Sequence, residues 1–174
     1  SANDATIADF NGDGNMDVVF PGDLGYAVVL GVGNGSFGRA TLLGESTPSY
    51  WAVAGDFDHD GQQDFTGAGG IFGHTYLGNG NGLFQAPLDA GVSATSQTVS
   101  GDFNGDGNID LAMISATPRK DGSNYGFKIA VGQGDGTFLQ YLTYVLWAIT
   151  PEGRAKNLGE VQIKGDDTRV EVTT

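Results

Sequence analysis

One acidic segment of nine residues occurs three times in the chain and constrains the fold more than any other feature. Each copy reads D-x-[ND]-x-D-G-x-x-D, and a glycine motif, G-x-G-[ND]-G-x-F, follows each copy. The acidic segments span residues 9–17, 56–64 and 102–110, and the glycine motifs span residues 31–37, 78–84 and 132–138. Two motifs that recur together at about 46-residue intervals predict a repeat protein.

Short apolar runs between these motifs predict β-strands. The runs are rich in Val, Ile, Phe and Tyr and are bounded by Gly or Asp, and no stretch of ten residues in the repeats has a helical period. The 30 glycines among 174 residues agree with many tight turns. The expected strands are residues 17–20, 26–30, 50–54, 71–77, 109–114 and 127–131. About four strands in a unit of this length is typical of a propeller blade, so we expect an all-β fold of three β-propeller-like blades in an incomplete ring.

The spacing of oxygen-bearing side chains in the acidic segment is typical of a cation site. Side chains at positions 1, 3 and 5 converge in a tight loop, Gly at position 6 permits the turn, and Asp at position 9 closes the shell. Position 7 can add its backbone carbonyl group. Several hard oxygen ligands in a flexible loop favour Ca²⁺, because Mg²⁺ needs stricter octahedral geometry. We therefore expect about three Ca²⁺ ions, one in each loop.

Two other structures share part of this pattern. An EF-hand also has oxygen ligands at positions 1, 3 and 5, but its twelfth position is Glu. Here that position holds Phe20, Gly67 and Met113, so an EF-hand is excluded. A metal-free turn is the remaining alternative. Three loops that share four ligand positions disfavour it, because clustered carboxylates without a cation repel one another.

The two motifs together resemble FG-GAP repeats, also called VCBS repeats, which occur in integrin α-subunit propellers and in bacterial exported proteins. Residues 84–87, F-Q-A-P, keep part of that family's trailing signature. The resemblance covers residues 1–142, as repeats 1–47, 48–93 and 94–142, and implies blades with a Ca²⁺ loop between two strands, used in adhesion, recognition or scaffolding. The ligands that it implies are the side chains of Asp9, Asn11, Asp13, Asp17, Asp56, Asp58, Asp60, Asp64, Asp102, Asn104, Asp106 and Asp110, and the backbone carbonyls of Asn15, Gln62 and Asn108.

The chain departs from that family in its number of blades. Propellers of the family commonly close with about seven blades, whereas three repeats leave open edges on the first and last blade. We expect these edges to be covered by more chain, by other copies or by the tail. Residues 143–174 should form a small β extension with a hairpin of residues 161–164 and 169–172, which packs on the last blade or pairs with a neighbouring copy.

Composition limits the partners and the compartment. The chain has a formal net charge of −13 and only 8 basic residues. Because phosphate binding needs clustered Lys and Arg, nucleic acid is not an expected partner. The absence of an 18-residue apolar run predicts no membrane span. The sequence begins at Ser1 without a signal peptide, which suggests a mature form or a fragment. We expect an exported bacterial protein, extracellular or on the cell surface.

Catalysis is not expected from this sequence. It has no Cys, and its two histidines lie inside an acidic loop (His59) and in an expected strand (His74). Two non-enzymatic functions remain. The favoured one is an adhesive or structural building block, in which β-strand contacts between copies complete a filament. The alternative is a lectin-like propeller fragment of a larger exported protein, which recognises a carbohydrate or a protein.

Overall fold

The computed structural model describes residues 4–44, 48–69, 72–93, 97–115, 126–141, 144–149 and 155–161. All regular elements within these ranges are β-strands, which confirms the all-β prediction. No helix among the described residues is long and apolar enough to cross a membrane. The chain divides into two compact units, Ser1–Gln140 and Tyr141–Thr174, and each is described by itself.

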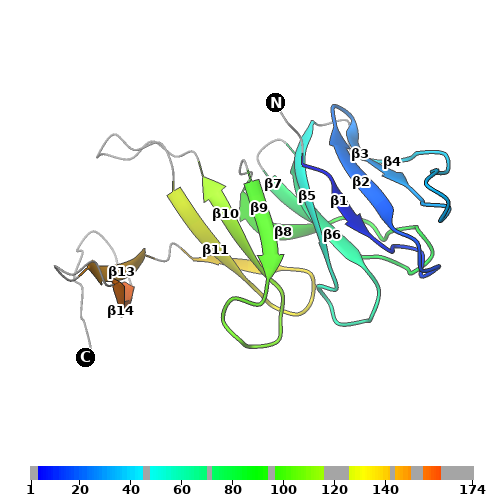
Figure 1. The fold of residues 1–174 in the computed structure, drawn as a ribbon. Coiled ribbons are helices and arrows are strands. Elements are labelled where there is room, and N and C mark those ends of the chain that lie inside the picture. The colour runs from blue at the N-terminus through cyan, green and yellow to red at the C-terminus, as the bar shows by residue number, and fades with distance from the viewer. Residues whose placement is uncertain are drawn as a thin grey trace. The chain divides into compact units, whose positions relative to one another are not determined.

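The repeats form three four-stranded antiparallel sheets (Figure 1). Within each sheet the strands follow one another in chain order, so each sheet is a meander. This is the blade architecture that the repeats predict, and the sheets are called blades 1, 2 and 3. Blade 1 holds β1 (Thr6–Ala8), β2 (Asp17–Gly22), β3 (Gly25–Val29) and β4 (Thr41–Leu43); blade 2 holds β5 (Ser49–Gly55), β6 (Asp64–Gly69), β7 (Phe72–Tyr76) and β8 (Leu88–Ser93); blade 3 holds β9 (Gln97–Gly101), β10 (Asp110–Ser115), β11 (Gly126–Gly132) and β12 (Phe138–Tyr141).

All six strands expected from the sequence are present, as β2, β3, β5, β7, β10 and β11. Ile71, the expected first residue of β7, lies outside the described residues. The other six strands of the blades are very short, like β1, or contain glycine, like β6. Their side-chain pattern is weak for that reason, and the sequence alone does not mark them.

The hydrophobic core lies between the blades. Between blades 1 and 2, Tyr26 and Phe65 are buried and their rings meet edge to face, with centroids 5.0 Å apart. Between blades 2 and 3, the buried cluster consists of Trp51, Phe57, Ala68, Ala90, Val92, Leu111, Met113, Ala130 and Phe138. Consecutive blades therefore bury apolar faces against one another, as the units of a repeat protein do.

A phenylalanine in each of the first two acidic loops joins its blade to the next. The Phe10 ring meets the Phe84 ring of blade 2 edge to face, with centroids 5.4 Å apart, and the Gly82 N–H donates to the Phe10 carbonyl at 3.0 Å. The same two contacts recur one blade later, from Phe57 to Phe138 at 5.5 Å and from Gly136 to Phe57 at 3.1 Å. The acidic loop of one blade is thus fixed to the glycine motif of the following blade.

The second unit contains one antiparallel pair, β13 (Tyr144–Ile149) and β14 (Ala155–Val161). The expected C-terminal β extension is present, but the described hairpin lies earlier in the chain than the expected one. Val161 pairs with Tyr144, because the apolar run of residues 144–149 offers a stronger strand partner than the polar segment after it. The remaining residues of the expected hairpin, 162–164 and 169–172, lie outside the described residues.

Candidate metal centre

The three acidic loops share one backbone conformation. Positions 4 and 6 have positive φ in every loop, and position 4 of the second loop is His59, the one described residue other than glycine with positive φ (63°). A side chain makes this left-handed conformation unfavourable, so Gly is preferred there. The glycines that occupy the other positions are Gly12 (71°), Gly14 (85°), Gly61 (83°), Gly105 (81°) and Gly107 (91°).

The first carboxylate of the loop accepts hydrogen bonds from the loop's own backbone. Asp9 accepts from the Gly12 N–H through Oδ1 and from the Gly14 N–H through Oδ2, both at 2.8 Å. Asp102 makes the same two bonds in the third loop, at 2.7 and 3.1 Å. In loops 1 and 3, both oxygens of this carboxylate are therefore engaged by backbone donors.

The last carboxylate of the loop is fully buried and ties the acidic loop to the glycine motif. Asp17 is 0% exposed; it accepts from the Phe10 N–H at 2.9 Å and from the Gly31 N–H at 2.8 Å. Asp64 and Asp110 make the corresponding pairs of bonds, at 2.8 and 2.8 Å and at 3.0 and 2.9 Å. These bonds explain why the two motifs always occur together.

Only glycine fits at the first position of the glycine motif. A Cβ added to Gly31 would overlap the backbone carbonyl of Met16, the residue before the last Asp of the loop. The corresponding overlaps are Gly78 with the Gln63 carbonyl and Gly132 with the Ile109 carbonyl. The close approach of the two segments brings the backbone N–H of this glycine within reach of the buried carboxylate.

The middle positions distinguish loop 2 from loops 1 and 3. In loop 1 the Asn11 amide donates to the Asp13 carboxylate at 3.1 Å, and Asn104 donates to Asp106 in the same way at 2.9 Å. Loop 2 has Asp58 in place of this Asn and therefore has no such donor. Its positions 1, 3, 5 and 9 are all carboxylates, those of Asp56, Asp58, Asp60 and Asp64.

Loop 2 also brings its carboxylates closest together. One oxygen each of Asp56, Asp58 and Asp64 lie within 4.8 Å of one another, and no other such trio of acidic or histidine side chains occurs in the described part of the chain. Oδ1 of Asp56 is buried and has no hydrogen-bond partner, unlike its counterparts in Asp9 and Asp102. An unpartnered buried carboxylate oxygen beside two further carboxylates fits a hard divalent cation.

Three of the loop carboxylates have shifted pKa values. Burial raises the pKa of Asp64 from 3.8 to about 6, against the lowering effect of the Gly78 and Phe57 N–H groups, and the charges of Asp58 and Asp60 raise it further. The pKa of Asp13 is lowered, by the Asn15 N–H first and the Asn11 amide second. The pKa of Asp106 is lowered by the corresponding groups of loop 3. The raised pKa of Asp64 means that its negative charge is unfavourable in the folded chain, and a bound cation would relieve this.

Position 7 of each loop contacts the carboxylate at position 5 through its backbone. The N–H groups of Asn15, Gln62 and Asn108 donate to that Asp at 2.8, 2.7 and 2.8 Å. The carbonyl ligation expected of these residues stays a prediction. Sequence reasoning missed a contact between loops, in which His59 Nε2 lies 2.9 Å from Asn108 Oδ1. The one signal for it was a histidine where the other two loops have Gly.

A family model described as an FG-GAP-like repeat matches residues 9–67. The chain is similar to FG-GAP-like repeats. The matched segment contains the first two acidic loops and the glycine motif between them, so the resemblance expected from the motifs is confirmed there. The third loop lies beyond the match, and its likeness to the FG-GAP-like segment rests on the shared backbone and hydrogen bonds described above.

Among solved structures, the chain is similar to that of an Agrocybe aegerita lectin, described as specifically recognising non-reducing terminal N-acetylglucosamine. The TM-score is 0.54 at 22% sequence identity, and the similarity covers 88% of this chain and 37% of the lectin chain. At this identity the comparison supports the fold alone, and the chain spans well under half of the lectin's length. No curated protein matches the sequence.

Proposed function

We propose that the chain is an exported, calcium-stabilised, non-enzymatic module that acts as an adhesive or structural building block. The observation that carries the proposal is the buried, unpartnered Asp56 Oδ1 beside the carboxylates of Asp58 and Asp64. Such a group is costly unless a cation neutralises it. All-oxygen donors are the chemistry that Ca²⁺ takes.

The other two loops would hold Ca²⁺ with one amide in place of a carboxylate. Asn11 and Asn104 supply an Oδ1 oxygen at position 3, which already accepts the N–H of Asp13 at 3.0 Å and of Asp106 at 2.8 Å. Ligand charge tunes Ca²⁺ affinity, so loops 1 and 3 should bind more weakly than loop 2. Extracellular modules work with dissociation constants of about 0.1–1 mM, so loops of that affinity would be filled outside the cell.

Bound Ca²⁺ would act on the fold and not on a substrate. Each loop is bonded to its own blade and to the glycine motif through the last Asp, and loops 1 and 2 are also bonded to the next blade through Phe10 and Phe57. An ion that orders the loop would therefore stabilise the blade and its junction together. Ligand binding to the native state alone raises stability by mass action.

Thermal unfolding tests this proposal. In 2 mM Ca²⁺ the melting temperature should exceed that in chelator by several degrees, and 2 mM Mg²⁺ should restore little of the difference. Asp56→Asn should remove most of the calcium-dependent rise. Asp23→Asn, at an exposed carboxylate in the turn between β2 and β3, is the matched control and should retain it. Equal melting temperatures in Ca²⁺ and chelator would reject the metal role.

The absence of catalysis is part of the proposal. His59 is next to Asn108 Oδ1, and His74 lies half-buried in β7, where its backbone carbonyl accepts a hydrogen bond from the Thr66 hydroxyl. Among the hydrogen bonds of the described residues, neither imidazole contacts a hydroxyl group. Hydrolysis of model glycosides or esters that His74→Ala abolishes without unfolding the chain would contradict this part.

Carbohydrate recognition is the second candidate, because the fold is similar to that of a lectin that recognises terminal N-acetylglucosamine. A propeller scaffold supports many unrelated sites, so the fold alone does not identify a ligand. Binding of the calcium-loaded chain to an array that includes N-acetylglucosamine-terminated glycans tests this candidate. Saturable binding competed by the free sugar would favour it over the structural role, and an array without signal would remove it.

A further inference from the structure

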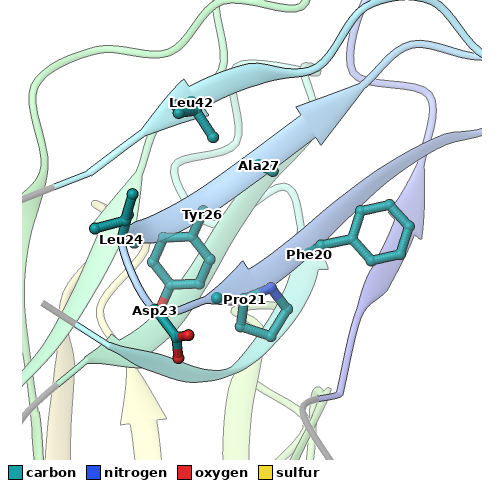
Figure 2. A pocket seen from close by; sticks show the side chains of 9 residues that line it. Phe20, Pro21, Asp23, Leu24, Tyr26, Ala27 and Leu42 are labelled. Carbon is teal, nitrogen blue, oxygen red and sulfur yellow. The ribbon is translucent and has the colours of Figure 1, made fainter. Parts of the chain in front are cut away.

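The outward face of blade 1, here called the head face, is apolar and exposed. Ile7 on β1, Phe20 on β2 and Leu42 on β4 are 61%, 45% and 67% exposed. Phe20 pairs with Ala27 and Ala27 pairs with Leu42, so Phe20, Ala27 and Leu42 share one face of the sheet (Figure 2). Ile7 pairs with Val18, two residues before Phe20, and so lies on the same face. A hollow of about 350 Å³ lies beside them, lined mainly by apolar residues of β2, β3 and β4.

The repeat shows what covers this face in the other blades. When the blades are aligned on the buried Asp of each loop, Val18 of the head face corresponds to Phe65 in blade 2 and to Leu111 in blade 3. Phe65 and Leu111 are both 0% exposed and pack against the preceding blade. The head face is therefore the same surface that blades 2 and 3 bury against a neighbouring blade.

The glycine motif of blade 1 lacks the contact that its counterparts make. Phe84 and Phe138 each receive the ring of a loop phenylalanine from the preceding blade. Phe37, the corresponding residue of blade 1, is 53% exposed. Gly35 corresponds to Gly82 and Gly136, whose N–H groups donate to the carbonyl of that same loop phenylalanine.

The missing half of this contact lies at the other end of the repeats. Phe103 in loop 3 corresponds to Phe10 and Phe57, which are 1% and 3% exposed. Phe103 itself is 51% exposed, and Val99 on the first strand of blade 3 is 60% exposed. This outward side of blade 3, here called the tail face, offers the loop phenylalanine and its accepting carbonyl, and the head face holds the matching Phe37 ring and the Gly35 N–H donor.

We propose that a second copy of this chain docks head to tail, so that its Phe37 receives the Phe103 ring and its Gly35 N–H donates to the Phe103 carbonyl. The junction repeats the two blade junctions that already exist within the chain, from Phe10 to Phe84 and from Phe57 to Phe138. It joins unlike faces, so it either closes a ring of copies or extends a chain of them.

A second copy explains both faces at once. One covering segment, such as the C-terminal hairpin, would occupy a single face and leave the other open. Each copy instead carries one head and one tail, so association covers exposed apolar residues at both ends of the repeats. This inference deepens the proposed building-block function by naming its partner, and it rests on that function.

Two substitutions with opposite defects test the junction. Phe37→Asp should block the head and Phe103→Asp should block the tail, so each variant alone should sediment as a monomer in 2 mM Ca²⁺ at concentrations where the wild type associates. A 1:1 mixture should form a one-to-one dimer, because one variant keeps its tail and the other keeps its head. Leu83→Asp, at an exposed position (55%) of blade 2, should associate like the wild type.

Milder variants measure how much each phenylalanine contributes to the affinity between copies. Phe37→Ala and Phe103→Ala should each raise the dissociation constant at least about tenfold, as loss of a central aromatic contact does. A wild type that stays monomeric at about 0.5 mM, variants that associate alone, or a mixture that stays monomeric would overturn the inference. A monomer whose melting temperature still rises with Ca²⁺ would reject the junction and leave the metal role intact, so the two failures are distinguishable.

Discussion

Loop 2 and its two neighbours have the same backbone and differ in charge. Loops 1 and 3 engage both oxygens of their first Asp with backbone N–H groups and place an Asn amide against the Asp at position 5. Loop 2 has an Asp at that Asn position and leaves Asp56 Oδ1 buried without a partner. The oxygens of the first Asp therefore all have hydrogen-bond partners in loops 1 and 3, whereas one of them has no partner in loop 2.

The difference separates two roles that one motif can combine. The buried last Asp holds the turn together in all three loops, through two backbone N–H groups that need no ion. The cluster of Asp56, Asp58 and Asp64 is repulsive unless an ion is bound. We expect loop 2 to depend most on Ca²⁺, and loops 1 and 3 to keep their shape without it.

Removing the last Asp of a loop should have the largest effect. In Asp17→Asn and Asp64→Asn, an amide NH₂ faces a backbone N–H that had a carboxylate acceptor, which costs about 1–3 kcal/mol. In chelator, Asp64→Asn should cost less than Asp17→Asn, because it also removes a buried charge beside two others. In Ca²⁺ the order should reverse. Urea unfolding of both variants in both conditions measures this, and an unchanged order would contradict the division of roles.

Exchanging Asn and Asp at position 3 should move the properties of one loop to another. Asp58→Asn should weaken calcium binding at loop 2 about tenfold while stabilising the chain in chelator, since one like charge is lost. Asn11→Asp should do the opposite at loop 1. Isothermal titration with Ca²⁺ measures both affinities. If both exchanges changed affinity in the same direction, charge would not be the cause of the difference between the loops.

The pH dependence should change sign with the metal. Because burial raises the pKa of Asp64 from 3.8 to about 6, the folded chain holds a proton between about pH 4 and 6 that the unfolded chain has lost. In chelator, stability should therefore fall by a few degrees in melting temperature as the pH rises through this window. In saturating Ca²⁺ it should rise, since the ion competes with the proton. Parallel melting curves from pH 4 to 7 would show whether the two trends diverge.

His59 should give the smallest effect. Its left-handed backbone, with φ of 63°, costs about 1 kcal/mol that Gly avoids. His59→Gly and His59→Ala both lose the contact with Asn108, so comparing them isolates the backbone cost. The Gly variant should be the more stable by about 1 kcal/mol, measured by urea unfolding. Equal stability would mean that loop 2 does not keep the backbone of loops 1 and 3.

The sequence predicted the loops, the blade repeat and six strands because each has a local signature. The spacing of Asp, Asn and Gly is visible along nine residues, and runs such as β2 and β11 are rich in β-formers. β6 was missed because Gly67 interrupts its side-chain pattern. In the structure, Gly67 is needed because Tyr26 of the neighbouring blade occupies the space of a Cβ.

The buried hydrogen bonds accepted by Asp17, Asp64 and Asp110 also could not be predicted from the sequence. Their bonding partners lie 7 residues before them and 14 to 22 residues after them, and only the folded blade brings those N–H groups together. The unequal charge of the loops is visible in the sequence, because position 3 is Asp58 in loop 2 but Asn11 and Asn104 in the other two. Its consequence, an unpartnered Asp56 oxygen, depends on burial that no local pattern encodes.

Amide chemical shifts during a Ca²⁺ titration test the central claim most directly. Gly14, Gly61 and Gly107 hold the same position in the three loops, and each donates its N–H to the first Asp of its own loop. The Gly61 amide resonance should shift at the lowest Ca²⁺ concentration, with Gly14 and Gly107 following at higher concentrations. A titration to about 10 mM that leaves Gly61 unmoved, or moves it last, would contradict the account.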